Sequence, residues 1–365
     1  MTTNADPNGD PSFRLDGIDP NGALAHAVGL KNQAMNADLV SRSDGWERGV
    51  RSVLLGNDRI SIEVVVDRGL DIASARVRQV PVAWRSPTAI VAPWFVENTG
   101  FGPHRGFFGG LLTTCGFDHV GAPTERSAER FGYPARTTES LPMHGRASGT
   151  PARLLAYGVR DTAAGPQAFV EGEVTQVAVF GEHIVLTRSI TIDWGSSEVR
   201  VSDSITNAGF APTPLALLYH VNVGWPIVAP HARVHVAGTV VNGEGDPTVL
   251  RAPERGAEER VWMHEPTATA NARGTAAIVN SHVDADTAAG LRVTWDTASL
   301  PSIVEWQIAN VAAHYAVALE PTTLRLVDGA FEFPELQPDE TFTTGVTIEL
   351  LHGPAGSTFT EEVAL

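Results

Sequence analysis

"HIVLTRSITIDWG", residues 183–195, is the stretch that decides the fold class. In an extended chain one face would carry its apolar side chains, Ile184, Leu186, Ile190, Ile192 and Trp194. The opposite face would carry His183, Thr187, Ser189, Thr191 and Asp193, and Arg188 is the one break on the apolar face. Apolar and polar residues that alternate with a period of two predict a half-buried antiparallel β-strand.

The same alternation recurs along the rest of the chain. "TFTTGVTIELL" (341–351) repeats it, and shorter runs such as "SIEVVVD", "EVRVSDSITN" and "GLRVTWD" are separated by clusters of Gly, Pro, Asn and Asp. The 35 glycines and 24 prolines are spread over many turns and do not gather in one linker. We therefore expect an all-β fold of large stacked antiparallel sheets with few short helices. Residues 13–365 are expected to form a single domain after a flexible N-terminal tail, residues 1–12.

Composition limits the classes of partner. The chain has 365 residues, 43% of them hydrophobic, and a formal net charge of −16. Such a charge argues against binding to nucleic acid or to an anionic membrane surface, and a neutral small molecule suits the surface better. The start of the sequence lacks a secretory signal, and no apolar run approaches the length of a membrane helix. With a single cysteine, Cys115, expected to be a buried apolar residue, these features predict a cytoplasmic protein. The sequence gives no indication of oligomeric state.

Several catalytic motifs are absent from the sequence. It contains no G-x-x-x-x-G-K-[ST], no H-E-x-x-H and no G-x-S-x-G, and "GFGPHRGFFGG" (100–110) does not have the dinucleotide-binding spacing. The nearest approach to a metal-binding pair is His231 and His235, for which a solvated strand is the better interpretation. We expect neither a metal nor an organic cofactor.

Three stretches carry candidate chemistry. In "AHYAVALEPTT" (313–323), alternation places Glu320 at the end of a face of alanines, which leaves room for a ligand, although a solvated strand end would explain it too. In "LLYHVNVGWP" (217–226), His220 and Asn222 share one strand face, and a buried histidine with a backbone partner is the alternative to a catalytic one. In "LPMHGRASG" (141–149), His144 lies in a turn two residues before Arg146.

Taken in order, "PMHGR", "YHVNVGWP" and "ALEPTT" resemble the matching segments of the aldose 1-epimerase (galactose mutarotase) family. "VVVDRGLDIASARVRQVPVAW" and "GGLLTTCGFDHVG" are similar to an uncharacterised bacterial branch of that superfamily. The resemblance extends over roughly residues 50 to 350, and its specificity comes from the ordered set of short motifs.

This resemblance implies a β-supersandwich with a sugar bound across its concave sheet. It also implies roles for three residues: Glu320 as the general base that takes the proton of the anomeric hydroxyl, His220 as the general acid that protonates the ring oxygen, and His144 as a sugar contact. Reference pKa values of about 4.3 for Glu and about 6.5 for His suit these opposite roles. The implied activity is that of an isomerase of carbohydrate metabolism.

The sequence departs from the family pattern at an early arginine, because "GFFGGLLTTCG" (106–116) occupies its place. Arg146 or Arg105 could substitute for it. Trp306 could form an apolar platform for a sugar face, or could be buried, since Val304 and Ile308 share its side. Arg68 and Asp71 could reach the cleft or could stabilise a turn. We assign Glu320 and His220 as catalytic candidates, and His144, Arg146, Asn222 and Trp306 as substrate-binding candidates.

Two other classes of function fit the same residues. One is an isomerase or β-eliminating lyase that acts on a keto-sugar, with possible metal assistance in holding an enediolate. The other is a non-catalytic carbohydrate-binding protein, because a fold does not fix a function. The presence of both Glu320 and His220 favours an enzyme.

Overall fold

Residues 183–195 form strand β13 (His183–Asp193), in which every second side chain is buried, as the alternation predicts. The computed structural model describes residues 29–267, 271–312 and 314–356. The predicted tail, residues 1–12, lies outside the described residues.

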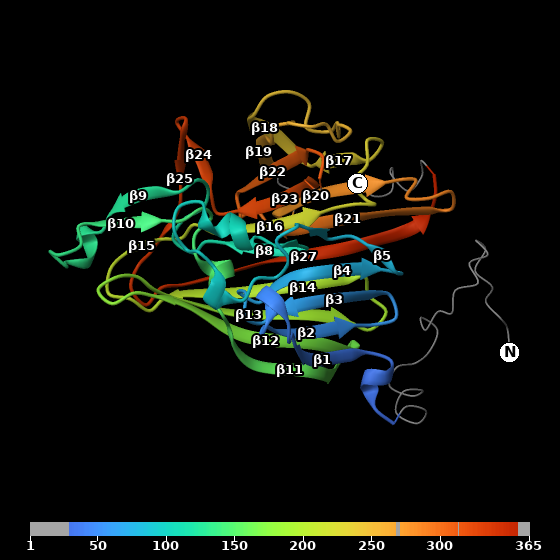
Figure 1. Cartoon of the computed structure of the whole chain (residues 1–365), viewed down its shortest axis with the longest axis horizontal. Coiled ribbons are helices and arrows are strands. Elements are labelled where there is room, and N and C mark those ends of the chain that lie inside the picture. Colours follow the sequence, from blue (N-terminus) through green and yellow to red (C-terminus); the bar gives the residue numbers. More distant parts are fainter. Residues whose placement is uncertain (1–28, 268–270, 313, 357–365) are drawn as a thin grey trace.

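The first of two large sheets carries the strands of the candidate site. It has eleven antiparallel strands, and the strands run along the long axis of the molecule (Figure 1). Their order is β1 (Asn36–Ser41), β2 (Arg51–Gly56), β3 (Ile60–Val65), β4 (Asp71–Val77), β8 (Leu112–Cys115), β16 (Leu218–Val223), β23 (Tyr315–Thr322), β22 (Ser302–Ala309), β19 (Arg260–Pro266) and β18 (Gly238–Asn242), with β5 (Val80–Pro81) paired to β4.

The second sheet has eight antiparallel strands and contains β13. Its order is β11 (Arg153–Thr162), β12 (Gly165–Val177), β13, β14 (Glu198–Asn207), β27 (Thr341–Pro354), β21 (Thr287–Asp296), β20 (Arg273–Asn280) and β17 (Arg233–Val236).

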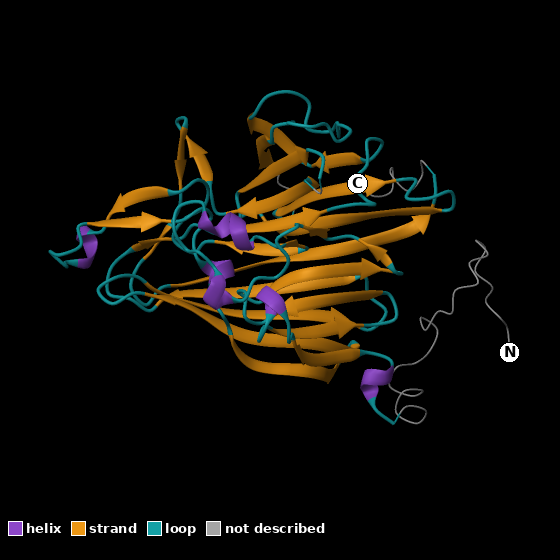
Figure 2. Cartoon of the chain, in the orientation of Figure 1, coloured by secondary structure: helices purple, strands orange, loops and turns teal. Residues whose placement is uncertain are grey.

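Smaller elements extend from the two sheets. Four two-stranded pairs are β6 (Trp84–Arg85) with β7 (Gly109–Gly110), β9 (Thr124–Ser127) with β10 (Thr138–Leu141), β15 (Thr213–Pro214) with β26 (Glu335–Leu336), and β24 (Arg325–Val327) with β25 (Ala330–Glu332). The helices of the described residues are six short 3-10 turns: η1 (Lys31–Gln33), η2 (Gly45–Glu47), η3 (Pro93–Phe95), η4 (Gly102–Gly106), η5 (Glu129–Phe131) and η6 (Ala147–Gly149). Figure 2 shows this predominance of strands, which confirms the predicted fold class. In the part of the chain that the structure describes, no helix is long and apolar enough to cross a bilayer.

The inner faces of the two sheets meet in one apolar core. A single cluster of buried side chains draws residues from Met35 to Leu350 and includes Leu112 and Leu319 of the first sheet and Ile190 and Ile348 of the second. Such face-to-face packing of sheets explains why half of each strand is apolar. Burial of this apolar surface is the main favourable term in folding.

Arg188 explains the one break in the alternation of β13. The side chain is fully buried and forms a bidentate pair with Asp203 of β14, with nitrogen to oxygen distances of 2.8 and 2.7 Å. It also donates to Thr114 Oγ1 of β8 at 2.7 Å, and the hydroxyl of Tyr219 in β16 donates to Asp203 at 2.6 Å. Burial alone would lower the pKa of Arg188, but the charge and hydrogen bonds of Asp203 raise it above its ordinary value. Through these hydrogen bonds to Thr114 and Tyr219, the charged pair of the second sheet is joined to the first sheet within the core.

Replacement of Arg188 by Ala should lower the free energy of unfolding by about 3–5 kcal/mol, because it leaves the Asp203 carboxylate buried without its partner. Urea denaturation measures this loss. Arg160→Ala is the matched control, since Arg160 forms a half-exposed pair with Glu171 at 2.8 Å and should cost less than about 1 kcal/mol. Equal losses in the two variants would contradict a structural role for the buried network.

Candidate active site

His220 and Glu320 lie opposite each other on the neighbouring strands β16 and β23. The register pairs Leu218 with Thr322 and Asn222 with Ala318, so His220 faces Glu320 between them. His220 Nε2 is 3.2 Å from Glu320 Oε1. Two residues that are far apart in the sequence are thereby brought into contact by sheet pairing alone.

A cavity of about 910 Å³ covers this face of the first sheet. Its floor includes His220, Glu320 and Trp306 on β16, β23 and β22. Its walls come from Trp84 and residues 86–88, from two loops that contribute His104, Phe107 and residues 120–122, from the turn at His144, and from residues near β24 and β25. Concave sites of this size, largely apolar with a few converging polar groups, are typical binding sites for small molecules.

Aromatic rings surround the imidazole of His220. The ring centroids of Phe107, His144 and Trp306 lie 5.4, 5.8 and 5.8 Å from that of His220, each in an edge-to-face arrangement. The ring centroids of Trp84 and Trp306 are 6.0 Å apart. Of the two alternatives for Trp306, the structure therefore favours a place on the cavity floor. The rings exclude water from His220 and offer flat apolar surfaces of the kind that sugar faces contact.

The turn at His144 is held by its backbone. His144 N donates to the oxygen of Gly121, and its own oxygen accepts from Gly116 N, both at 2.9 Å. His144 has a φ of +57°, and Gly145 follows with a φ of +74° where a Cβ would lie 2.3 Å from the Gly116 oxygen. Only glycine fits at position 145, and the close approach of the two segments fixes the His144 ring against His220.

Burial sets the protonation of this cluster. It lowers the pKa of His220 to about 3 and that of His144 to about 4, and it raises the pKa of Glu320 well above its ordinary value. The charge of Glu259 raises the pKa of Glu320 further. Burial therefore pushes both groups toward their neutral forms, a protonated carboxyl beside a neutral imidazole, and in these forms the two side chains carry one proton between them.

Two polar atoms of the pair lack hydrogen-bond partners among the described residues. They are Nδ1 of His220 and Oε1 of Glu320, both buried, and the 3.2 Å contact of Oε1 with His220 Nε2 is close without having hydrogen-bond geometry. Unpartnered buried polar atoms are uncommon in folded proteins, and at the floor of a cavity they are free to hydrogen-bond a ligand.

Asn222 does not reach the cavity, contrary to the predicted substrate contact. Its side chain is fully buried and donates to the backbone oxygen of His220 at 2.9 Å. Asn222 favours the protonated form of His220 without offsetting the effect of burial. The residue shares a strand face with His220 as predicted, but it lies where its side chain supports the histidine.

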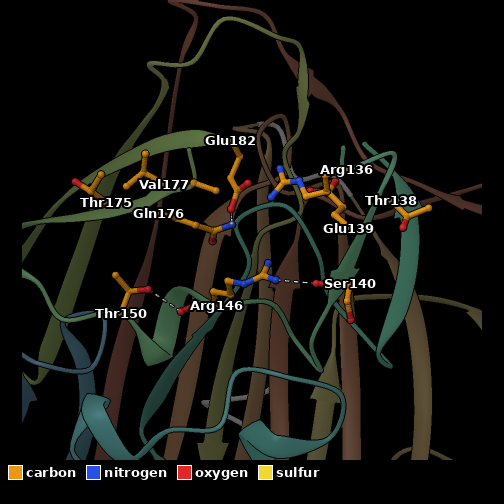
Figure 3. Close-up of a pocket in the computed structure, with 11 residues that line it drawn as sticks. Arg136, Thr138, Glu139, Ser140, Arg146, Thr150, Thr175, Gln176, Val177 and Glu182 are labelled. Atoms are coloured by element: carbon orange, nitrogen blue, oxygen red, sulfur yellow. Dashed lines mark hydrogen bonds between the residues drawn. The ribbon is translucent and has the colours of Figure 1, made fainter. Parts of the chain in front are cut away.

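Arg146 also lies away from this cavity. Figure 3 shows it in a second cavity of about 340 Å³, where its guanidinium donates to the Ser140 oxygen at 2.7 Å. His144 and Arg146, two residues apart in one turn, therefore line different cavities. Arg105, the other arginine candidate, is a surface residue 3.7 Å from Glu97 with a side chain that is 78% exposed.

Arg68 and Asp71 support the backbone around the site. Arg68 donates to the backbone oxygens of Ser148 and Val91 at 2.6 and 2.9 Å. Asp71 accepts from Thr114 N at 2.9 Å and is completely buried. Of their two interpretations, stabilisation of the chain is the one that these contacts fit.

Sequence reasoning missed several residues of the cavity. Trp84, Phe107 and His314 come from loops or loop-adjacent positions whose direction no periodicity reveals. Glu259 precedes β19, and its carboxylate accepts from Trp306 Nε1 at 2.8 Å. A tryptophan with apolar neighbours at i−2 and i+2 was the only signal that pointed to this region.

Comparison with known proteins places the chain in a family. Residues 47–350 match the model of the family described as "Domain of unknown function (DUF4432)". The chain belongs to this family. No curated protein matches the sequence.

Solved structures show the same fold at low sequence identity. A protein of Klebsiella pneumoniae, provisionally named an aldose 1-epimerase, has a TM-score of 0.76 at 22% identity, over 90% of this chain and 85% of its own. A galactose mutarotase-like protein of Clostridium acetobutylicum has a TM-score of 0.60 at 12% identity, over 88% of this chain and 100% of its own. Galactose 1-epimerase of Lactobacillus acidophilus has a TM-score of 0.55 at 13% identity, with the same shares covered. The predicted galactose mutarotase-like supersandwich is thereby confirmed as the fold of this DUF4432 protein.

The imidazoles of His220 and His144 should stay neutral well below the ordinary histidine range, because burial penalises the charged form. Their ¹⁵N shifts, followed by NMR from pH 8 down to pH 4 and assigned with His220→Asn, measure this directly. The urea-unfolded protein supplies the reference, with histidines that titrate near about 6.5. Titration of His220 near that reference value in the folded protein would contradict the desolvated site.

Proposed function

We propose that this protein is an aldose 1-epimerase that interconverts the α and β anomers of a free sugar. The observation that carries the proposal is the His220–Glu320 pair, with 3.2 Å between Nε2 and Oε1, on the floor of a cavity with aromatic walls. Ring opening needs one group that removes a proton from the anomeric hydroxyl and another that delivers a proton to the ring oxygen. A pair that shares a single proton can do both.

The proton balance follows from the shared proton. With that proton on His220, the Glu320 carboxylate takes the proton of O1 while His220 protonates O5. The C1–O5 bond breaks and C1–O1 becomes a carbonyl, so the open-chain sugar faces a protonated carboxyl and a neutral imidazole. Burial favours this neutral state of the pair. Rotation about C1–C2 and the reverse transfers then close the ring as the other anomer.

His144 and Trp306 serve as the sugar contacts of this site. His144 stays neutral beside His220 and can hydrogen-bond a sugar hydroxyl, while Trp306 supports an apolar sugar face. Among the described residues no three His, Cys, Asp or Glu side chains are grouped so as to hold a metal ion. Function without a metal or organic cofactor stays a prediction, and metal analysis of the purified protein tests it.

Glu320→Gln and His220→Asn should each slow anomer exchange by about 10²–10⁴-fold, because each removes one partner of the proton transfer. Free aldoses are screened by polarimetry and exchange NMR, and the fastest is used for the comparison. Glu171→Gln is the matched control. Glu171 lies on β12 and pairs with Arg160 of β11, so the same change there should keep full activity.

Normal turnover by folded Glu320→Gln protein would contradict the mechanism. If no free aldose responds to the wild type, keto-sugars with added divalent metal are assayed next. Turnover of a keto-sugar that still depends on Glu320 would support the alternative function, a keto-sugar isomerase or lyase. Sugar binding without any turnover would support the other alternative, a non-catalytic carbohydrate-binding protein.

The acid limb of the pH profile should lie well below the ordinary histidine range, and the alkaline limb well above the ordinary range of a glutamate. Below the depressed pKa of His220, about 3, both groups are protonated and no base remains, while above the raised pKa of Glu320 no acid remains. The two limbs report the coupled pair rather than either residue alone. Stopped-flow polarimetry, corrected for the uncatalysed rate, measures the profile. An acid limb centred near about 6.5, the ordinary histidine value, would contradict it.

A further inference from the structure

The cavity floor extends well beyond the reacting pair. The strand register pairs Glu320 with Val304, Val304 with Met263, and Met263 with Asn242, so these residues form one row across β23, β22, β19 and β18. All four residues line the cavity, as does His220. With about 4.8 Å between neighbouring strands, the row places Asn242 roughly 14 Å from Glu320.

A pyranose ring is about as wide as one strand spacing. With its anomeric carbon at the His220–Glu320 pair and its face on Trp306, it leaves the part of the cavity over β19 and β18 open. The whole volume, about 910 Å³, lies toward the upper end of the range of about 300–1,000 Å³ that accommodates drug-sized ligands. The cavity is therefore longer than a free monosaccharide requires.

The lining away from the reacting pair, which we call the outer compartment, is mainly apolar. Its apolar residues are Val261 and Met263 of β19 and Leu324, Phe331 and Phe333 on or beside the β24–β25 hairpin, and its polar residues include Asn242 and Glu259. Val261 and Phe331 are 47% and 57% exposed although both are large apolar residues, and Phe331 lies on the β24–β25 hairpin that projects from the sheets in Figure 1. Such surface is stabilised when a ligand covers it.

Charge sets a further limit on the ligand. None of the described residues that line the cavity is a lysine or an arginine, while the lining includes the acidic side chain of Glu259. The chain as a whole carries a net charge of −16. A phosphate or carboxylate group on the ligand would enter without a cationic partner, and that is costly in a desolvated site.

We propose that the substrate is an uncharged aldose that carries an apolar substituent away from C1, and that this substituent occupies the outer compartment. This inference rests on the proposed function for the position of the anomeric carbon. A second sugar ring fits less well, since its hydroxyls would meet mainly aliphatic and phenyl surface. Asn242 lies at the end of the row and can close the compartment with one hydrogen bond.

Isothermal titration calorimetry tests the proposal directly. The probes are D-glucose and D-galactose, each as the free sugar, as its 3-, 4- and 6-O-benzyl ethers and as its 6-phosphate. At least one ether should bind about 10- to 100-fold more tightly than its parent sugar, the gain expected for burial of a phenyl group. The phosphates should bind more weakly than the parents.

Two variants locate the gain. Val261→Glu places a carboxylate at the half-exposed edge of the compartment, and Phe331→Ala removes an exposed ring, so each should reduce the ratio of ether to parent affinity to near one. Val241→Glu is the matched control, because Val241 is 38% exposed on β18 without lining the cavity, and it should keep the ratio.

The proposal is overturned if no ether binds more tightly than its parent, if nothing binds, or if the gain persists in both compartment variants. Anomer exchange of the same sugars, measured by NMR, separates this outcome from the proposed function. If the parent sugars exchange anomers but no benzyl ether binds more tightly than its parent, the apolar substituent is ruled out and the proposed epimerase activity stands. If an ether binds more tightly, Val261→Glu abolishes that gain in affinity, and no sugar exchanges anomers, the outer compartment is supported and the epimerase activity is ruled out.

Discussion

The buried pair of Arg188 and Asp203 connects the fold to the site. Its charges lie between two sheets whose other inner residues are almost all apolar, and they are tolerated there because guanidinium and carboxylate satisfy each other with two parallel hydrogen bonds. Tyr219 donates to the same carboxylate, and this inward contact fixes the strand on which the next residue is His220. Because successive side chains of a strand point to opposite faces, anchoring Tyr219 in the core turns His220 into the cavity.

The site itself combines desolvation with close contact. Aromatic rings on three sides take His220 out of water, and Glu320 meets it from the adjacent strand. In water the two groups would ionise independently, whereas here burial pushes both toward their neutral forms. In the proposed mechanism a single proton moves between His220 and Glu320, and in the further proposal the apolar outer compartment selects the substrate.

Much of the fold could be predicted from the sequence, because the signal in strands is local. Alternation alone identifies β13 and β27, and it places Tyr219 and His220 on opposite faces of their strand. The contact between His220 and Glu320 depends on which strands pair and in what register, and periodicity carries no information on that. Only the resemblance to a family links the two residues.

The directions of side chains in turns are harder still to predict from the sequence. Arg146 follows His144 by two residues, yet the backbone bonds of His144 to Gly116 and Gly121 direct the two side chains to different cavities. Trp84 and Phe107 belong to segments whose path is set by packing against the finished sheet.

A structure of the protein with a bound free aldose would show directly whether the His220–Glu320 pair acts on the anomeric centre. We expect the sugar to lie over Trp306, with O1 and the ring oxygen each within about 2.6–3.2 Å of one member of the pair. A sugar bound elsewhere, for example in the cavity that contains Arg146, or one that presents neither oxygen to the pair, would contradict this expectation.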